Sequence, residues 1–139
     1  MATSDTGTLK DPCDALAAAR DIQREAASVG FDWPDARGVF AKVEEEILEL
    51  REALDEGDIL HAKTELGDVL FAVVNLSRFV PADPHEELSR ATARFQRRFS
   101  LLREELLRQG RAIDKCSLEE LDVVWEEVKR RETANGKMS

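Results

Sequence analysis

The chain has 139 residues, of which 42% are hydrophobic and 35% are charged, and its net charge is −9. A chain of this length can bury about two-thirds of its unfolded surface, which is enough for one hydrophobic core. The acidic balance disfavours nucleic acid and anionic membranes as general partners, because both carry negative charge. It does not disfavour a nucleotide whose phosphates arrive with a bound cation.

Three features bear on the cellular location. The longest uncharged stretch around the apolar segment, residues 69–77, is far shorter than the about 20 residues of a membrane-spanning helix. The chain does not begin with the basic and apolar residues of a signal sequence. Cys13 and Cys116 lie in dissimilar contexts without a Cys-x-x-Cys spacing, which favours free thiols over a disulfide or a ligand pair. We expect a cytoplasmic protein with neither a membrane nor a nucleic acid as partner.

Helical periodicity dominates the chain, and there is little strand signal. The predicted fold class is all-α, a bundle of about five helices in a single domain over residues 11–133. Residues 1–10 and 134–139 are predicted to be disordered tails. The helices are expected at residues 12–28, 36–55, 59–79 and 85–109, with a fifth that follows Ser117 and ends near residue 132.

Local signals mark several helix ends. Asp35 can cap the second helix by accepting a hydrogen bond from a free N–H group of its first turn. Pro81 and Pro84 stop the third helix. Ser117 and Glu120 have the spacing of a capping box and open the fifth helix.

Two pairs of acidic residues carry the main functional signal. Glu46 and Glu49 lie three residues apart on the second helix, and Glu65 and Asp68 repeat this spacing on the third. Three-residue spacing places both members of a pair on one helical face. The break at residues 56–58 lets the two helices fold back antiparallel. The four carboxylates would then form a cage of hard oxygen donors suited to Mg²⁺ or Mn²⁺.

The second pair lies on a helix that is apolar on nearly every side and is therefore expected to be buried. Its polar exceptions, Glu65, Asp68 and Asn75, fall within an arc of roughly 80°, with the small residue Ala72 between them. Unpaired buried carboxylates cost several kcal/mol each and repel one another, so this stripe needs a cation or basic partners. Asn75 is a candidate to contact the substrate.

The first pair has an ordinary alternative explanation. Glutamate is a good helix former, and a run of glutamates in a strongly charged chain is usually a solvated face. Glu46 borders an apolar stripe and Glu49 lies one step further round, so both could face the edge of the core. A metal site is the preferred interpretation, and a structural salt-bridge network is the alternative.

Basic and aromatic residues on the last two helices could form the other half of a phosphate site. Arg94 and Arg98 are one helical turn apart, and so are Trp125 and Lys129. Together these side chains could hold a polyphosphate and stack on a base. From the residues alone, a solvated helix face and a core tryptophan are the favoured explanation.

Other kinds of site are excluded or disfavoured. The chain has no glycine-rich phosphate loop, which excludes a P-loop nucleotidase. Neither His61 nor His85 completes the Glu-x-x-His motif of a di-iron bundle. His61 lies one turn before Glu65 and could touch phosphate, although a surface histidine is the favoured explanation. Trp33 is expected to be a packing anchor rather than a platform for a base.

Six segments, taken in order, resemble the MazG nucleoside triphosphate pyrophosphohydrolases over residues 15–132. The acidic motifs alone are shared across the all-α pyrophosphohydrolases, so the specificity comes from the ordered set. Many bacterial members carry two such domains in tandem, whereas this chain has room for one, most similar to the second. The segments are residues 29–35, Lys42-Val43, Glu45-Glu46-x-x-Glu49, 65–76, 94–99 and 124–129.

The resemblance implies a role for each group of residues. Arg94, Arg98, Trp125 and Lys129 match positions that the family uses for its nucleotide, which reverses the preference stated above for the two arginines and the lysine. It also implies a homodimer, which agrees with the exposed apolar face that five helices would leave. The residues implied to bind Mg²⁺ are Glu46, Glu49, Glu65 and Asp68.

The expected reaction is hydrolysis of a nucleoside triphosphate between the α- and β-phosphates, giving the monophosphate and pyrophosphate. Glu45 is the candidate to orient or deprotonate the attacking water. One alternative is a relative restricted to dUTP, dCTP or phosphoribosyl-ATP, which the spacing of the acidic motifs does not separate. The other is a helical interaction module without turnover.

Overall fold

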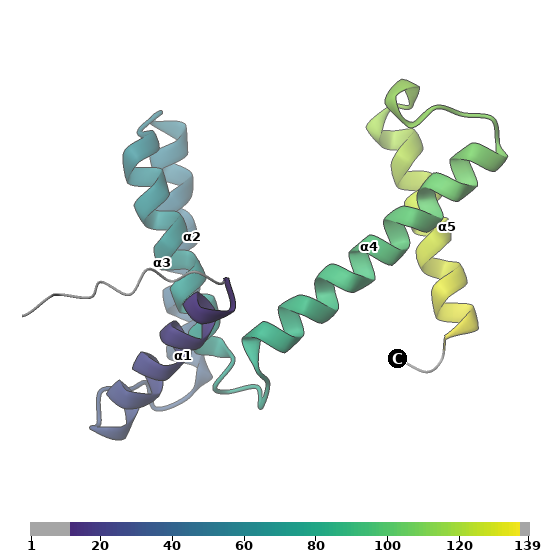
Figure 1. Cartoon of the computed structure of the whole chain (residues 1–139). Coiled ribbons are helices and arrows are strands. Elements are labelled where there is room, and N and C mark those ends of the chain that lie inside the picture. Colours follow the sequence, from purple (N-terminus) through teal and green to yellow (C-terminus); the bar gives the residue numbers. More distant parts are fainter. Residues whose placement is uncertain (1–11, 137–139) are drawn as a thin grey trace, which may run out of the picture. The chain divides into compact units, whose positions relative to one another are not determined.

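The computed structural model describes residues 12–136, and every regular element in this range is a helix, with no strand, which confirms the predicted all-α class (Figure 1). The predicted tail at residues 1–10 and the side chain of Cys13 lie outside the described residues. None of the described helices is long and apolar enough to cross a membrane. The elements are α1 Pro12–Ser28, α2 Ala36–Asp55, α3 Ile59–Leu76, α4 Pro84–Arg108, a 3₁₀ helix Ile113–Lys115 and α5 Leu118–Asn135.

The predicted caps are present at two helix starts. The Asp35 carboxylate accepts a hydrogen bond of 2.8 Å from the backbone N–H of Arg37 at the start of α2. The Ser117 hydroxyl accepts one of 3.1 Å from the N–H of Glu120 at the start of α5. Each bond satisfies a backbone donor that has no partner within the helix, which is why these residues set the boundaries.

Two predicted helix ends are wrong. Helix α3 ends at Leu76, three residues before the predicted end at residue 79, and Ser77 follows as its C-cap. The Ser77 hydroxyl donates to the carbonyl of Val74 at 2.6 Å, so a local side-chain bond competes with continuation of the helix. Helix α5 runs to Asn135, because no helix breaker precedes Gly136. Residues 134 and 135, expected in the C-terminal tail, are therefore helical.

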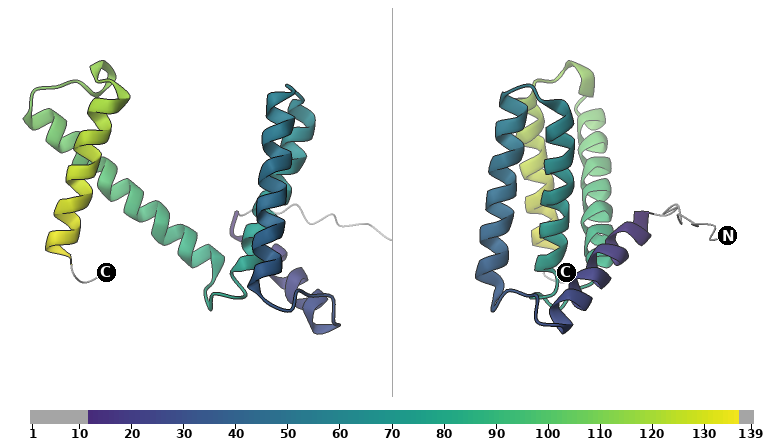
Figure 2. Two further views of the ribbon diagram at one scale, coloured as in Figure 1. Left: turned by 180° about the vertical axis from the view of Figure 1, so that it is seen from behind. Right: turned by 90° about the vertical axis from the view of Figure 1, so that its left-hand side faces the viewer.

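The chain divides into two compact units, Met1–Glu87 (unit 1) and Leu88–Ser139 (unit 2). In unit 1, α2 and α3 run antiparallel and side by side, joined by a tight turn in which Gly57 has a φ of 74° (Figure 2). Helix α1 packs against α3. The buried apolar residues of unit 1 are Val39, Ala53, Ala62, Ala72 and Val74.

Helix α3 is less buried in unit 1 than its composition predicts. It contacts α2 through small residues and Glu65, while its larger aliphatic residues lie on other sides and are about half exposed. Of the predicted polar stripe, Glu65 is therefore buried and Asp68 is exposed, and the larger apolar residues form an exposed surface. A residue of α3 is buried only if it lies on a face that packs against another helix. Small side chains such as Ala62 and Ala72 let the helices approach closely. The exposed residues are Leu66, Leu70, Phe71 and Val73.

Unit 2 is built from the rest of α4 and from α5, which packs against it through a core of four buried residues. Trp125 and Phe99 pack on the edge of this core, and the Trp125 ring lies 5.3 Å from that of Phe95. The apolar face of α4 supplies half of this core. The four core residues are Leu102, Leu106, Val124 and Val128.

Candidate metal centre and adjoining pocket

Three carboxylates from two helices converge in unit 1. One carboxylate oxygen from each of Glu46, Glu49 and Glu65 lies within 4.8 Å of the others, and no further described residue joins this group. Glu46 and Glu49 come from one face of α2, as their three-residue spacing requires, and Glu65 comes from the facing side of α3. The antiparallel packing of α2 and α3 therefore assembles three of the four predicted ligands.

The two buried glutamates are each paired on one side only. Glu46 and Glu65 have 6% and 7% of their surface exposed. One oxygen of Glu46 lies 2.9 Å from Lys42 Nζ, and one oxygen of Glu65 lies 2.8 Å from His61 Nε2. The other oxygen of each, Oε2, is buried and has no hydrogen-bond partner among the described residues. Neighbouring carboxylates only accept hydrogen bonds while they are ionised, so in that state they cannot satisfy these oxygens.

The pKa values of Glu46 and Glu49 are shifted in opposite directions. The hydrogen bond from Lys42 is the main cause that lowers the pKa of Glu46. Desolvation, followed by the neighbouring Glu65 and Glu46, raises the pKa of Glu49. A proton on Glu49 would relieve the repulsion, and so would a cation. Oxygen donors of this kind, two of them buried and unpaired, suit a hard divalent metal ion.

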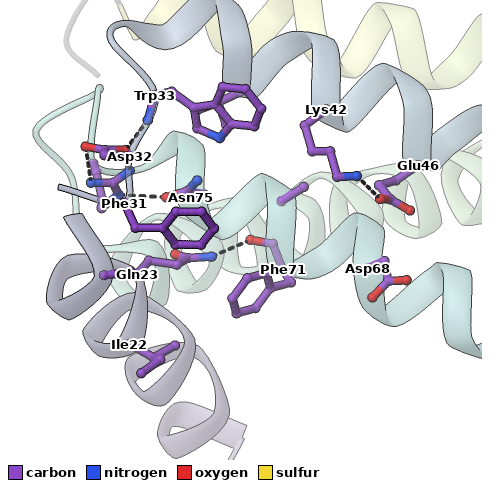
Figure 3. Close-up of a pocket in the computed structure, with 14 residues that line it drawn as sticks. Ile22, Gln23, Phe31, Asp32, Trp33, Lys42, Glu46, Asp68, Phe71 and Asn75 are labelled. Atoms are coloured by element: carbon purple, nitrogen blue, oxygen red, sulfur yellow. Dashed lines mark hydrogen bonds and ion pairs between the residues drawn. The ribbon is translucent and has the colours of Figure 1, made fainter. Parts of the chain in front are cut away.

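Two of the predicted acidic residues lie outside this group of three. Asp68 is exposed on α3 and, with Glu46, lines one end of a pocket (Figure 3). Glu45 is exposed on α2, and its carboxylate lies 3.4 Å from Lys42 Nζ. Lys42 therefore contacts both Glu45 and Glu46, three and four residues further along the same helix.

The pocket has a volume of about 510 Å³ and extends from the acidic residues along α3 to α1 and the α1–α2 loop (Figure 3). A cavity of this size is in the range that binds small molecules. Its walls are largely aromatic and aliphatic, with a few polar groups. The lining residues used below are Gln23, Phe31, Trp33, Phe71 and Asn75.

Gln23 presents an unpaired acceptor at this pocket. It is 7% exposed, and its Nε2 donates to the backbone carbonyl of Phe71 at 2.7 Å. A backbone carbonyl only accepts, so this contact identifies the amide nitrogen and leaves Oε1 as the other atom. That oxygen is buried without a partner among the described residues. An unpaired buried carbonyl costs about 1–3 kcal/mol, which a ligand N–H group would recover.

The orientation of the Asn75 amide also follows from its hydrogen-bond partner. Its Oδ1 accepts a bond of 2.6 Å from Arg78 Nε, and a guanidinium only donates, so the NH₂ group is at the other end of the amide. Arg78 also binds Asp32 at 2.6 Å, which ties the α1–α2 loop to the end of α3. No pattern in the sequence indicated Gln23, Asp32 or Arg78. The last two are 46 residues apart, and no local pattern pairs them.

Trp33 packs against its own unit, as predicted, and also lines the pocket. Its ring packs on Gly38, where an added Cβ would lie 2.6 Å from Trp33 Cε3. The residue is nevertheless 44% exposed and lines the pocket. The close approach requires a glycine at position 38, since any side chain there would displace the ring.

The predicted nucleotide-binding residues Arg94, Arg98, Trp125 and Lys129 all lie in unit 2. Arg94 is exposed on α4. Arg98 Nε donates to Glu132 at 2.6 Å, and the Lys129 ammonium lies 3.3 Å from Glu126. Trp125 is half-buried against Phe95.

The fold and this site define a class of protein: an all-α chain in which two antiparallel helices gather carboxylates that can hold a divalent metal ion beside a pocket. Residues 37–102 match the MazG nucleotide pyrophosphohydrolase domain. The chain belongs to the MazG family, as its motifs predict.

Named relatives support this membership. The Thermotoga maritima protein named nucleoside triphosphate pyrophosphohydrolase/pyrophosphatase MazG is 42% identical over 127 residues, 91% of this chain and 49% of the relative. The Escherichia coli K12 nucleoside triphosphate pyrophosphohydrolase is 38% identical over 120 residues, 85% of this chain and 46% of the relative. The chain thus spans about half the length of both relatives.

Proposed function

We propose that the protein is a Mg²⁺-dependent nucleoside triphosphate pyrophosphohydrolase that cleaves between the α- and β-phosphates. The observation that carries the proposal is the convergence of Glu46, Glu49 and Glu65, two of them with unpaired buried oxygens, next to a nucleotide-sized pocket. Membership of the MazG family and the names of two relatives agree with it.

The acidic residues would hold the ion. Glu46, Glu49 and Glu65 supply converging oxygens, and Asp68 completes the predicted set from the pocket wall. Bound there, Mg²⁺ or Mn²⁺ would neutralise charge on the phosphate oxygens and lower the pKa of a water molecule. Glu45, exposed one residue before Glu46, is the proposed group that orients this water or accepts its proton.

The pocket would hold the nucleoside part of the substrate. Phe31 and Trp33 offer aromatic surfaces on which a base can stack. Gln23 Oε1 offers an acceptor for a base N–H group, and the Asn75 amide offers a donor. These few oriented polar groups in an apolar wall are typical of a small-molecule site.

Arg94, Arg98, Trp125 and Lys129 are proposed to bind the nucleotide, the three basic residues through its phosphates. Arg98 and Lys129 already pair with Glu132 and Glu126, so a phosphate would have to replace a carboxylate at each of them. The exchange is favourable for a polyphosphate, which carries more charge than one carboxylate.

A homodimer is also proposed. Unit 1 leaves Leu66, Leu70 and Val73 exposed along α3, and water-exposed aliphatic surfaces of this kind mark interfaces. Sedimentation over a range of concentrations tests it. A monomer at all concentrations would contradict it.

The activity is tested with a panel of NTPs and dNTPs in the presence of Mg²⁺ or Mn²⁺, with released pyrophosphate and orthophosphate measured separately. We expect pyrophosphate from several substrates and no turnover after chelation. Release of orthophosphate by pure protein would contradict the cleavage position. Activity on one base alone would favour a restricted substrate such as dUTP or dCTP, and no activity would favour the interaction module.

A further inference from the structure

Each buried glutamate of the metal centre is preceded by a basic residue four positions earlier on its own helix. Lys42 contacts Glu46 on α2, and His61 contacts Glu65 on α3. In both pairs the basic group takes Oε1, and in both Oε2 is left buried and unpaired. The repetition on two different helices suggests that the basic residues control which oxygen faces the centre.

The contact between His61 and Glu65 has a defined direction. A carboxylate oxygen only accepts, so Nε2 of His61 must carry the hydrogen and donate it at 2.8 Å. The imidazole is about half exposed, whereas the Glu65 side chain is only 9% exposed. The histidine therefore reaches from the surface to the outer oxygen of a buried carboxylate.

We propose that His61 is a positioning residue of the metal centre, which holds Glu65 Oε1 so that Oε2 is presented to the ion. The inference rests on the proposed function, since it presupposes that Glu65 is a ligand. Groups that hydrogen-bond to a metal-binding side chain typically fix its orientation, and their loss weakens metal binding about 10–100-fold.

Repulsion makes such a restraint necessary. Glu65 lies beside Glu46 and Glu49, so its carboxylate would rotate away from them if no donor held it. An exposed contact between residues i and i+4 stabilises a helix by only a few tenths of a kcal/mol. Here the same contact would determine the geometry of a buried oxygen, and its effect should appear in metal affinity rather than in stability.

The test compares two substitutions in the full-length protein. His61→Leu removes the donor, whereas His61→Gln keeps an N–H group that can reach Glu65. Mn²⁺ binding is measured without nucleotide by calorimetry and by electron paramagnetic resonance. His61→Leu should weaken binding on the order of 10–100-fold, and His61→Gln should restore it to within a few-fold of the unsubstituted protein.

His85, the other histidine of the chain, is the matched control. It is exposed at the start of α4 and is not part of the acidic group, so His85→Leu should leave Mn²⁺ affinity unchanged. Circular dichroism establishes that each variant is folded.

The outcomes separate this inference from the proposed function. If the unsubstituted protein binds Mn²⁺ and His61→Leu binds it equally well, the positioning role is wrong and the metal centre stands. Equal losses in the leucine and glutamine variants would also overturn the role, because they would indicate that the imidazole itself binds the ion. If the unsubstituted protein binds no Mn²⁺, both the centre and this inference fail.

Discussion

At the scale of single residues, the site depends on oxygens that have no partner. Glu46 and Glu65 each have one buried oxygen that no other residue of the range 12–136 pairs, and Glu49 lies beside them with a raised pKa. A group whose function was only structural would be expected to pair these atoms, because unpaired buried charges are costly. Without a cation, these unpaired carboxylates destabilise the folded state. A bound metal ion would remove this cost, so the arrangement favours a metal site.

Replacing Glu49 tests this account. Glu49→Gln should abolish most turnover, by a factor on the order of 10³, because a metal ligand is lost. It should leave the melting temperature of metal-free protein unchanged or raised, since one of three repelling charges is removed. Thermal unfolding in a chelator and steady-state kinetics measure the two effects.

Glu52→Gln, an exposed glutamate one turn further along α2, is the matched control and should change neither quantity. A large drop in the melting temperature of metal-free Glu49→Gln would support the salt-bridge network instead.

At the scale of helices, α4 and α5 are joined by ion pairs that should make unit 2 sensitive to acid. Hydrogen bonds from Arg108, Gln109 and Arg131 lower the pKa of Glu105 to about 2. A depressed pKa stabilises the folded state above the unfolded value of about 4.5, and this contribution is lost as the pH falls towards 2.

Glu105→Gln should therefore flatten the loss of stability between pH 4.5 and pH 2. The measurement is thermal unfolding across this range in a Trp33→Phe background, so that Trp125 reports on unit 2. Glu104→Gln, an exposed neighbour, is the control. An equal acid slope in Glu105→Gln and the parent would mean that the ion pairs do not contribute.

Packing of the α1–α2 loop on α2 gives a second test at this scale. Alanine in place of a helical glycine usually stabilises a protein by about 0.5–1 kcal/mol. Gly67→Ala should show this gain, because its new Cβ meets nothing within 4 Å. Gly38→Ala should not, because its Cβ would lie 2.6 Å from the Trp33 ring and displace it.

Chemical denaturation of metal-free protein and the emission maximum of Trp33, measured in a Trp125→Phe background, distinguish the two variants. Equal stabilisation by both, with unshifted emission, would show that the tryptophan does not pack on Gly38.

At the scale of the whole molecule, the proposed nucleotide contacts of unit 2 can be tested through Arg98. Arg98→Ala should lower kcat/KM about tenfold to a hundredfold, because a charge-assisted bond to phosphate contributes roughly 1.5–3 kcal/mol. Metal affinity without nucleotide should not fall, since the arginine is not proposed to touch the ion.

Arg97→Ala is a close control, because Arg97 binds the same Glu132 at 2.6 Å and is not a proposed nucleotide contact. Kinetics that fall equally in both variants would assign Arg98 to the ion-pair network. Unaltered kinetics in Arg98→Ala would return it to a solvated helix face.

The sequence by itself determined the helices and which acidic residues of one helix share a face. Helical periodicity and caps are local properties, so α1 and α2 begin and end where they were predicted. The spacing of Glu46 and Glu49 likewise determined that they share a face. The predicted ends were wrong by a few residues at Ser77, where a side-chain bond competes with the helix, and at residues 134–135, where no helix breaker is present before Gly136.

Only the tertiary structure decided how these elements meet. It placed Glu65 rather than Asp68 in the group of three, oriented Gln23 against a carbonyl 48 residues away, and left the aliphatic residues of α3 exposed. These outcomes depend on which helical faces pack and on how closely they approach. Periodicity along one helix cannot decide this, because it does not specify the partner face.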